Sequence, residues 1–232
     1  MDALDSPESV DELYASWGEA PSFARPLMQG DVFFDVTLPG ISDEPQRAQI
    51  VMHPCNMRRG ANLVPLVTMA PVADYAMQAT DWQKRFRIMP LPEMSGTGSS
   101  NARADLLQFT SVASNQLSPS KRVAALSDAG VLLLQQRLVF TQTRILLSLD
   151  RIHEQMSPTF TELELQEDWV EEALTAAGDS QKQEALGQAT KDFQSWLDED
   201  NRSRRVRLQN VREHSRIRRE ARAECVERYS SR

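Results

Sequence analysis

A histidine and a cysteine stand two residues apart in the segment Met52-His-Pro-Cys-Asn-Met-Arg-Arg59, directly after an apolar run. If this segment is extended, His53 and Cys55 project to the same side, because alternate residues of a strand share a face. Basic neighbours such as Arg58 and Arg59 would stabilise a thiolate and make it more nucleophilic. Cys55 is therefore a candidate nucleophile with His53 as its base, although a structural turn with a half-buried thiol is the favoured interpretation.

The same segment is a weak candidate for a structural zinc site. The chain has only three histidines and two cysteines, and of these five soft ligands only His53 and Cys55 are close in sequence. A structural zinc ion takes four such ligands at short pairwise spacing. We therefore predict no metal and no cofactor. The wide separation of Cys55 and Cys225 also argues against a disulfide framework and favours a reducing compartment.

The last part of the chain is rich in arginine. Residues 201–232 contain eleven arginines, no lysine and four glutamates, a net charge of +7, so residues 1–200 carry −14 of the total of −7. Guanidinium groups bind phosphates through forked donors and release counterions. Helical spacing places Arg212, Arg216 and Arg219 on one face. The predicted contacts with a nucleic acid or another anion are Arg58, Arg59, Arg204, Arg205, Arg207, Arg212, Arg216, Arg219 and Arg222.

Other interpretations of this tail stay open. Arg216 with Glu220, and Glu224 with Arg228, have the i, i+4 spacing of ion pairs on a solvated helix. A thin apolar stripe would instead suit a partner helix or the chain's own body; it consists of Ile217, Ala221, Cys225 and Tyr229. The tail has few aromatic residues, so stacking on nucleobases is not indicated. The acidic segment 162–172 is a candidate dock for the tail.

Several strands are predicted upstream of the tail. A first amphipathic helix is expected over residues 6–17, with Ser6 as its cap and Pro7 at its first position. Period-two patterns and short apolar runs then predict strands at 30–36, 48–52, 63–70, 85–89 and 104–113. Residues 95–101, rich in glycine and serine, form the most linker-like segment.

Helices are predicted after Gln116. Ser118 and Pro119 begin a short one, and Ser127 caps a longer one that reaches Ile145. Thr161 and Glu164 have the spacing of a capping box, which predicts that a helix begins there. Another amphipathic helix covers residues 186–197, and the basic helix follows.

These elements predict an α+β protein, with a small SH3-like β-barrel followed by a helical C-terminal region. The expected parts are residues 1–27 as a helical lead-in, 28–115 as the barrel, 116–178 as helices packed on it, and 179–232 as terminal helices with the tail. The most apolar stretch, 131–149, is interrupted by glutamine and arginine and cannot span a membrane. With no signal sequence at its start, the protein is expected in the cytoplasm.

One stretch resembles the PemK/MazF toxins, which are small-barrel ribonucleases. It runs from Gln29-Gly-Asp-Val-Phe-Phe through Arg47 and Ile50-Val51 to Leu66-Val67 and Ala70-Pro71-Val72, about residues 28–73. The resemblance implies that Arg47 corresponds to the arginine at the RNA-cleavage site. The catalytic threonine or serine of that family corresponds to Val72 or Ala73, which lack a hydroxyl group. The layout is also similar to uncharacterised proteins of high-GC bacteria.

The sequence leads to one main hypothesis and two alternatives. The main hypothesis is a non-catalytic accessory protein, of a toxin or defence-like system, that binds nucleic acid or an acidic protein surface through its tail. The first alternative is an endoribonuclease that uses Arg47 with His53 or Cys55 for proton transfer. The second is a subunit of a homo-oligomer or larger complex joined through Leu186, Phe193 and Trp196. No membrane partner is expected.

Overall fold

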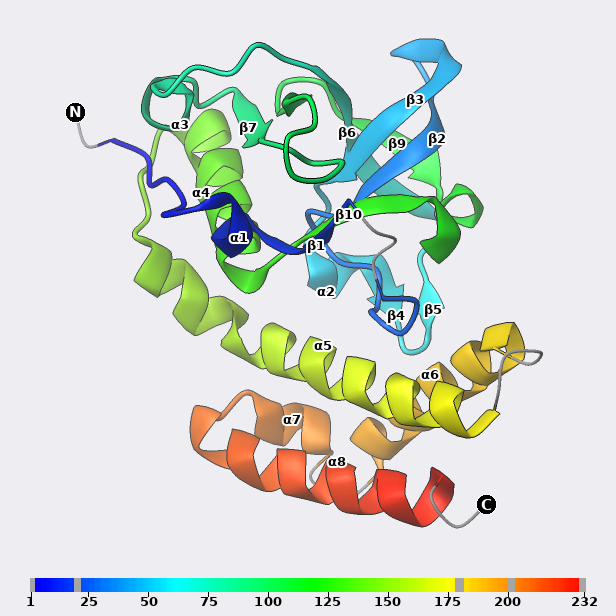
Figure 1. Cartoon of the computed structure of the whole chain (residues 1–232). Helices are drawn as coiled ribbons and strands as arrows, with labels where there is room; N and C mark the ends of the chain where they lie inside the picture. Colours follow the sequence, from blue (N-terminus) through cyan, green and yellow to red (C-terminus); the bar gives the residue numbers. More distant parts are fainter. Residues whose placement is uncertain (1–2, 19–21, 178–181, 200–202, 230–232) are drawn as a thin grey trace. The chain divides into compact units, whose positions relative to one another are not determined.

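The computed structural model describes residues 3–18, 22–177, 182–199 and 203–229 (Figure 1). It is an α+β structure, as predicted, and it divides into two compact units. The first unit contains Met1–Phe23, Leu27–Met57 and Leu63–Glu154, and the second contains Ala24–Pro26, Arg58–Asn62 and Gln155–Arg232. The last boundary between the units, after Glu154, falls inside a helix.

The first unit is built on one antiparallel sheet of eight strands in the order β1-β10-β2-β3-β6-β8-β7, with β9 paired to β6. The strands are β1 (Tyr14–Trp17), β2 (Val32–Leu38), β3 (Ser42–Ile50), β6 (Leu66–Asp74), β7 (Ile88–Leu91), β8 (Ala102–Asp105), β9 (Thr110–Ala113) and β10 (Arg122–Leu126). Two short strands, β4 (Arg58–Arg59) and β5 (Asn62–Leu63), pair separately. The described strands form no closed ring, so the SH3-like barrel is not confirmed.

The core of this unit lies on the inner face of β2, β3, β6 and β9. Alternate residues such as Phe33, Ile50 and Met69 are fully buried there, as expected for a sheet with one covered face. Thr110 Oγ1 donates a hydrogen bond of 2.7 Å to the carbonyl oxygen of Pro39, at the end of β2. The sheet therefore bends until β9 approaches β2, around the shared apolar cluster.

The predicted first helix is only partly present. The helix α1 covers Val10–Leu13, and its cap is Ser9, whose hydroxyl accepts from the Glu12 amide, instead of Ser6. From Tyr14 the chain continues as β1, which pairs with β10. The prediction of one helix through Trp17 was wrong, because pairing with β10 satisfies backbone groups and suits the aromatic residues of this segment.

The helix α4 (Asp128–Thr143) begins at Ser127 as predicted, with the Ser127 hydroxyl accepting from the Gly130 amide. Its buried Arg137 donates to the carbonyl oxygens of Trp82, Arg85 and Ile88 and so holds the segment between α3 (Asp81–Lys84) and β7. Burial lowers the pKa of Arg137 to about 10. This charged side chain therefore serves the fold.

The helix α5 (Leu149–Ala177) crosses the boundary between the units. The predicted helix start at Thr161 was wrong, because Thr161 lies inside α5 and its hydroxyl lies 3.0 Å from His214 Nδ1 in the buried interior. Pro158 interrupts the ladder, since it lacks the N–H that would donate to the carbonyl of Glu154. The unit boundary falls directly after Glu154.

The long elements described in the second unit are helices. Besides most of α5 it contains α6 (Lys182–Asp198), α7 (Arg204–Leu208), the 3-10 turn η4 (Val211–Glu213) and α8 (His214–Tyr229). Its core gathers around Trp169, whose ring centroid lies 5.3 Å from that of Trp196 and 5.6 Å from that of Phe193. Of the helices that the structure describes, none is long and apolar enough to cross a bilayer.

Two helical glycines give a matched test of how closely α4 packs against Leu13 at the end of α1. A Cβ atom on Gly130 in α4 would lie 2.3 Å from the carbonyl oxygen of Leu13, whereas a Cβ atom on Gly187 in α6 would meet open space. Gly130→Ala should therefore lower the free energy of unfolding by about 1–3 kcal/mol. Gly187→Ala should raise it by up to about 1 kcal/mol. Chemical denaturation of both variants checks this, and equal effects would contradict the packing.

Candidate functional site

His53 and Cys55 lie at an exposed corner after β3. The helix α2 (Pro54–Met57) begins at Pro54, and the Asn56 amide donates to the His53 carbonyl oxygen at 2.9 Å. The Cys55 amide donates to His53 Nδ1 at 3.3 Å, so the imidazole is turned toward residue 55. Although His53 is exposed, the surrounding atoms partly desolvate its ring and lower its pKa, because desolvation disfavours the charged form. This contact joins the imidazole to the Cys55 backbone and not to its thiol, and residues 54–57 form a helix in place of the extended segment assumed from the sequence, so the catalytic pair stays a prediction.

Arg47 is occupied elsewhere. Its guanidinium lies 2.5 Å from a carboxylate oxygen of Asp74, and it stands opposite Val72 in the β3–β6 ladder. Arg47 is three residues before the end of β3, or about 10 Å of strand, and His53 comes three residues after that end. The ion pair with Asp74 explains the position of Arg47 without a substrate, and it gives no support to a nuclease site.

Arg58 and Arg59 form β4, which belongs to the second unit, whereas Arg47, His53 and Cys55 belong to the first. The sequence does not predict that these five residues share a cleft, and the two groups are therefore described separately. Both arginines follow α2 directly, and Arg59 is exposed.

Most of the arginines at the start of the tail bind carboxylates of their own unit. Arg205 pairs with Glu162 of α5 at 2.7 Å and with Asp198 of α6 at 2.8 Å. Arg204 donates to the carbonyl oxygen of Trp196 at 2.6 Å, and its guanidinium carbon lies 4.5 Å from the centroid of the Trp196 ring. These contacts attach α7 to α5 and α6.

Glu220 is the centre of a second cluster. Its carboxylate accepts from Arg207 at 2.9 and 3.0 Å, from Arg216 at 3.0 Å and from Arg204 at 3.4 Å. The pKa of Glu220 lies below its usual value, mainly because Arg207 donates hydrogen bonds to its carboxylate. Arg207 also pairs with Glu213 at 3.3 Å. Three arginines thus share two glutamates, which leaves positive charge in excess.

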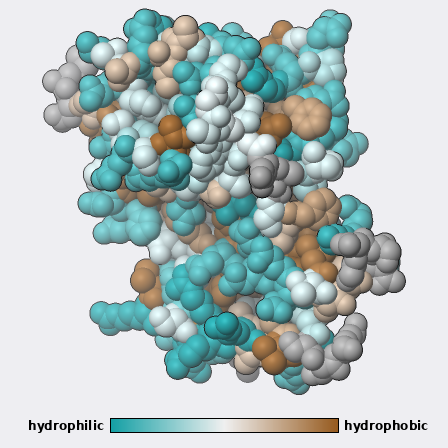
Figure 2. All heavy atoms as spheres, viewed as in Figure 1, coloured by the Kyte–Doolittle hydropathy of each residue, from teal (hydrophilic) through white to brown (hydrophobic). Residues whose placement is uncertain are grey.

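The two faces of α8 differ. Ile217, Ala221 and Cys225 are buried in the core of the second unit, and burial raises the pKa of the Cys225 thiol to about 12. The opposite face carries exposed arginines, which we call the arginine face: Arg212 of η4 and Arg216, Arg219 and Arg222 of α8. Figure 2 shows hydrophilic side chains over α7 and α8 on the side in view. The apolar stripe is thus a contact within the chain.

Charge compensation is uneven along the arginine face. Arg216 pairs with Glu220, and next to this face Arg218 pairs with Glu164 of α5 at 2.6 Å. Within the described ranges, no ion pair is made by Arg212, Arg219 or Arg222. Arg222 nevertheless lies close enough to Asp168 of α5 for its charge to act on that carboxyl group, so Arg212 and Arg219 are the two guanidinium groups most available to an external anion.

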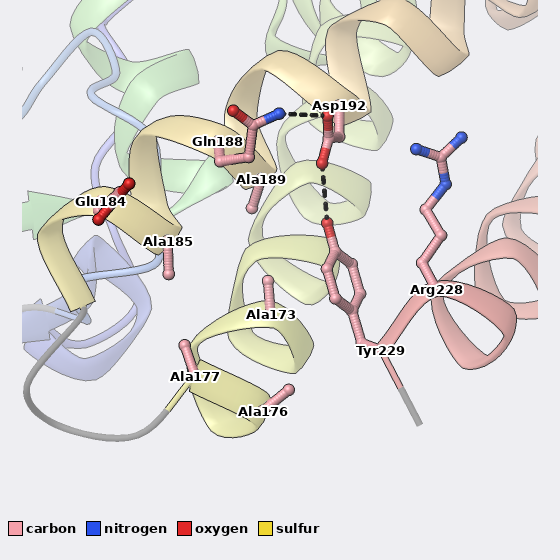
Figure 3. Close-up of a pocket in the computed structure, with 10 residues that line it drawn as sticks. All are labelled: Ala173, Ala176, Ala177, Glu184, Ala185, Gln188, Ala189, Asp192, Arg228 and Tyr229. Carbon is pink, nitrogen blue, oxygen red and sulfur yellow. Dashed lines mark hydrogen bonds between the residues drawn. The ribbon is translucent and has the colours of Figure 1, made fainter. Parts of the chain in front are cut away.

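A pocket of about 620 Å³ lies among α5, α6 and α8 within the second unit (Figure 3). Five alanines form its apolar part: Ala173, Ala176, Ala177, Ala185 and Ala189. Asp192 accepts from Gln188 at 2.8 Å and from the Tyr229 hydroxyl at 3.4 Å, so these polar groups bond to one another. The sequence analysis did not find this pocket. The spacing of the alanines on α5 and α6 could have indicated it, because these small side chains line the pocket.

Sequence comparisons give no further guide to the site. Neither a protein-family model nor a curated protein matches this chain. Among the described residues, no three or more His, Cys, Asp or Glu side chains are grouped so that they could hold a metal ion. The arrangement with the clearest chemical capacity is the arginine face, which offers forked donors to phosphate or carboxylate groups.

Proposed function

We propose that the protein is a nucleic-acid-binding accessory protein that contacts the phosphate backbone through the arginine face. The observation that supports this most is the division of α8 into a buried apolar stripe and an exposed row of arginines. Because the stripe is used inside the chain, the surface that α8 offers to a partner is the arginine face.

The charge pattern favours binding to phosphate groups of a partner over a role of these arginines in neutralising the protein's own acidic residues. The acidic residues of α5 and α6 are partly neutralised by Arg205 and Arg218, whose guanidinium groups they bind. Arg212, Arg219 and Arg222 are additional to these pairs and are exposed. A row of guanidinium groups matches the spaced charges of a nucleic-acid backbone and confers affinity without reading the base sequence.

The expected binding is weak and sensitive to salt. Nonspecific dissociation constants are on the order of 10⁻⁴–10⁻⁶ M at physiological salt. Replacing Arg212, Arg219 and Arg222 together by glutamine should reduce the slope of log K against log salt concentration by about 3, since each phosphate contact contributes roughly one unit. Fluorescence anisotropy with labelled duplex DNA, duplex RNA and single strands, over a salt series, measures this slope.

The matched control replaces three exposed basic residues of the first unit by glutamine: Lys84, Arg87 and Arg151. It changes the net charge by the same amount but should leave the slope unchanged. If both triple variants lower affinity equally, binding follows net charge alone and the arginine face is not the contact. If polyglutamate competes as well as an oligonucleotide of equal charge, an acidic protein surface is the better partner.

A further inference from the structure

The pocket of the second unit combines an apolar wall with an acidic side (Figure 3). Its volume of about 620 Å³ is that of a small-molecule site, for which roughly 300–1,000 Å³ is usual. The short side chains of the alanines on α5 and α6 leave this space and cover its wall with methyl groups. Binding here does not depend on the proposed contact with nucleic acid, which involves the arginine face.

Two carboxylates line the pocket from α6, those of Glu184 and Asp192. They are eight residues apart, which corresponds to about 12 Å along a helix. Among the residues that the structure describes, neither carboxylate forms an ion pair. The pocket therefore presents two negative charges without cationic partners, one near each end of this stretch of α6.

The carboxylate of Asp192 is held in place by its neighbours. Its oxygens accept from Gln188 Nε2 at 2.8 Å and from the Tyr229 hydroxyl at 3.4 Å, and that hydroxyl accepts from Trp169 Nε1 at 3.2 Å. A carboxylate has about four acceptor positions, so it can accept further donors from a ligand. A group that is ordered before binding loses less entropy when the ligand arrives.

The positive charge at the pocket is already compensated. Arg228 also lines it, but its guanidinium lies 2.6 Å from a carboxylate oxygen of Glu224, its neighbour one turn earlier on α8. Glu184 and Asp192 therefore determine the charge that a ligand meets. This charge favours a cation.

We propose that the pocket binds a linear diammonium ion, the chemistry of the polyamines. One ammonium group would donate to Asp192 and the other to Glu184, since an ammonium group is a compact charge with donors in several directions. The methylene chain between them would lie against the alanine wall and lose its contact with water. A ligand with a single ammonium group would leave one carboxylate without a partner.

The test is isothermal titration calorimetry of the full chain with α,ω-diamines of increasing length at physiological salt. Diaminooctane, whose extended chain is close to the separation of the two carboxylates, should bind once per chain. Its affinity should be at least about tenfold higher than that of diaminobutane, which is too short, and that of octylamine, which has one ammonium group. Equal affinities for diaminooctane and either of these two amines would overturn the proposal.

Two variants should weaken the binding of diaminooctane by at least about tenfold. The double variant Glu184→Gln with Asp192→Asn removes both charges from the pocket. The second is Ala176→Leu, which fills the pocket from an exposed position of α5, where a larger side chain does not disturb the core. Circular dichroism checks that both remain folded. Unchanged binding by either folded variant would contradict the site.

A matched control removes two carboxylates elsewhere. Asp150 and Glu154 are exposed on the part of α5 that belongs to the first unit. Asp150→Asn with Glu154→Gln changes the net charge by the same amount as the double variant of the pocket, and it should bind diaminooctane as the unchanged chain does. An equal loss of affinity in this control would mean that the diamine follows the overall negative charge, and the pocket would then not be its site.

Discussion

Replacing Arg122 by methionine is expected to lower the free energy of unfolding by about 3–5 kcal/mol, the usual cost of leaving one partner of a buried ion pair uncompensated. Arg122 Nη1 lies 2.9 Å from Asp31 Oδ2, and both side chains are completely buried. The second terminal nitrogen of Arg122 donates to the Ser22 carbonyl oxygen at 2.7 Å. Methionine fills much of the same volume, so the loss of stability would come mainly from the Asp31 carboxylate, which would stay buried without its cationic partner.

The neighbouring residue supplies the control. Lys121 pairs with Asp35 at 2.6 Å, but the Asp35 side chain is half exposed and that of Lys121 about one third exposed, so water screens the pair and Lys121→Met should cost less than about 1 kcal/mol. The double variant Asp31→Leu with Arg122→Met should recover part of the loss, because no buried charge remains. Urea denaturation of the unchanged chain, the two single variants and the double variant measures these losses and the recovery. A loss for Arg122→Met no larger than that for Lys121→Met would contradict the buried pair.

This ion pair also shows why β10 was not predicted. The segment Arg122–Leu126 begins with a charged residue and contains two adjacent alanines, both buried, so it has no period-two alternation. The sequence does not reveal that Asp31, 91 residues away, neutralises Arg122. The strand β1 was missed for the same reason. Tyr14 and Trp17 fit the apolar stripe of a helix, and it is pairing with the distant strand β10 that makes this segment extended.

The candidate site was predictable where its contacts are local. The i, i+4 pairs Arg216–Glu220 and Arg228–Glu224 are both present, and the stripe through Ile217 is buried. Spacing could not tell which arginines remain available, because Arg205 and Arg218 are paired with Glu162 and Glu164, 43 and 54 residues away in the sequence. Such pairs depend on how α7 and α8 pack on α5, which local patterns do not determine.

The second large effect is expected for Trp169→Ala, which should lower the free energy of unfolding by about 3–5 kcal/mol. Trp169 is completely buried, and its ring lies against Phe193, Trp196 and Tyr229, with centroid distances of 5.6, 5.3 and 6.4 Å. Alanine would leave a cavity at the point where α5, α6 and α8 meet. Thermal and chemical denaturation followed by circular dichroism measure the loss.

A more conservative variant separates packing from hydrogen bonding. Trp169 Nε1 donates to the Tyr229 hydroxyl at 3.2 Å, and Trp169→Phe removes this bond but keeps an aromatic ring. We expect it to cost about half as much as alanine, on the order of 2 kcal/mol. Equal losses for the two variants would mean that the indole hydrogen bond, and not the packing of the ring, dominates.

The same pair of variants tests whether nucleic-acid binding depends on folded α8. The arginine face is formed only while Ile217, Ala221 and Cys225 stay in the core around Trp169. Under conditions where Trp169→Ala is unfolded and Trp169→Phe is folded, only the phenylalanine variant should keep the full salt slope of binding. Identical binding by both would show that the arginines act as an unstructured basic segment, and the proposed interface would then need no helix.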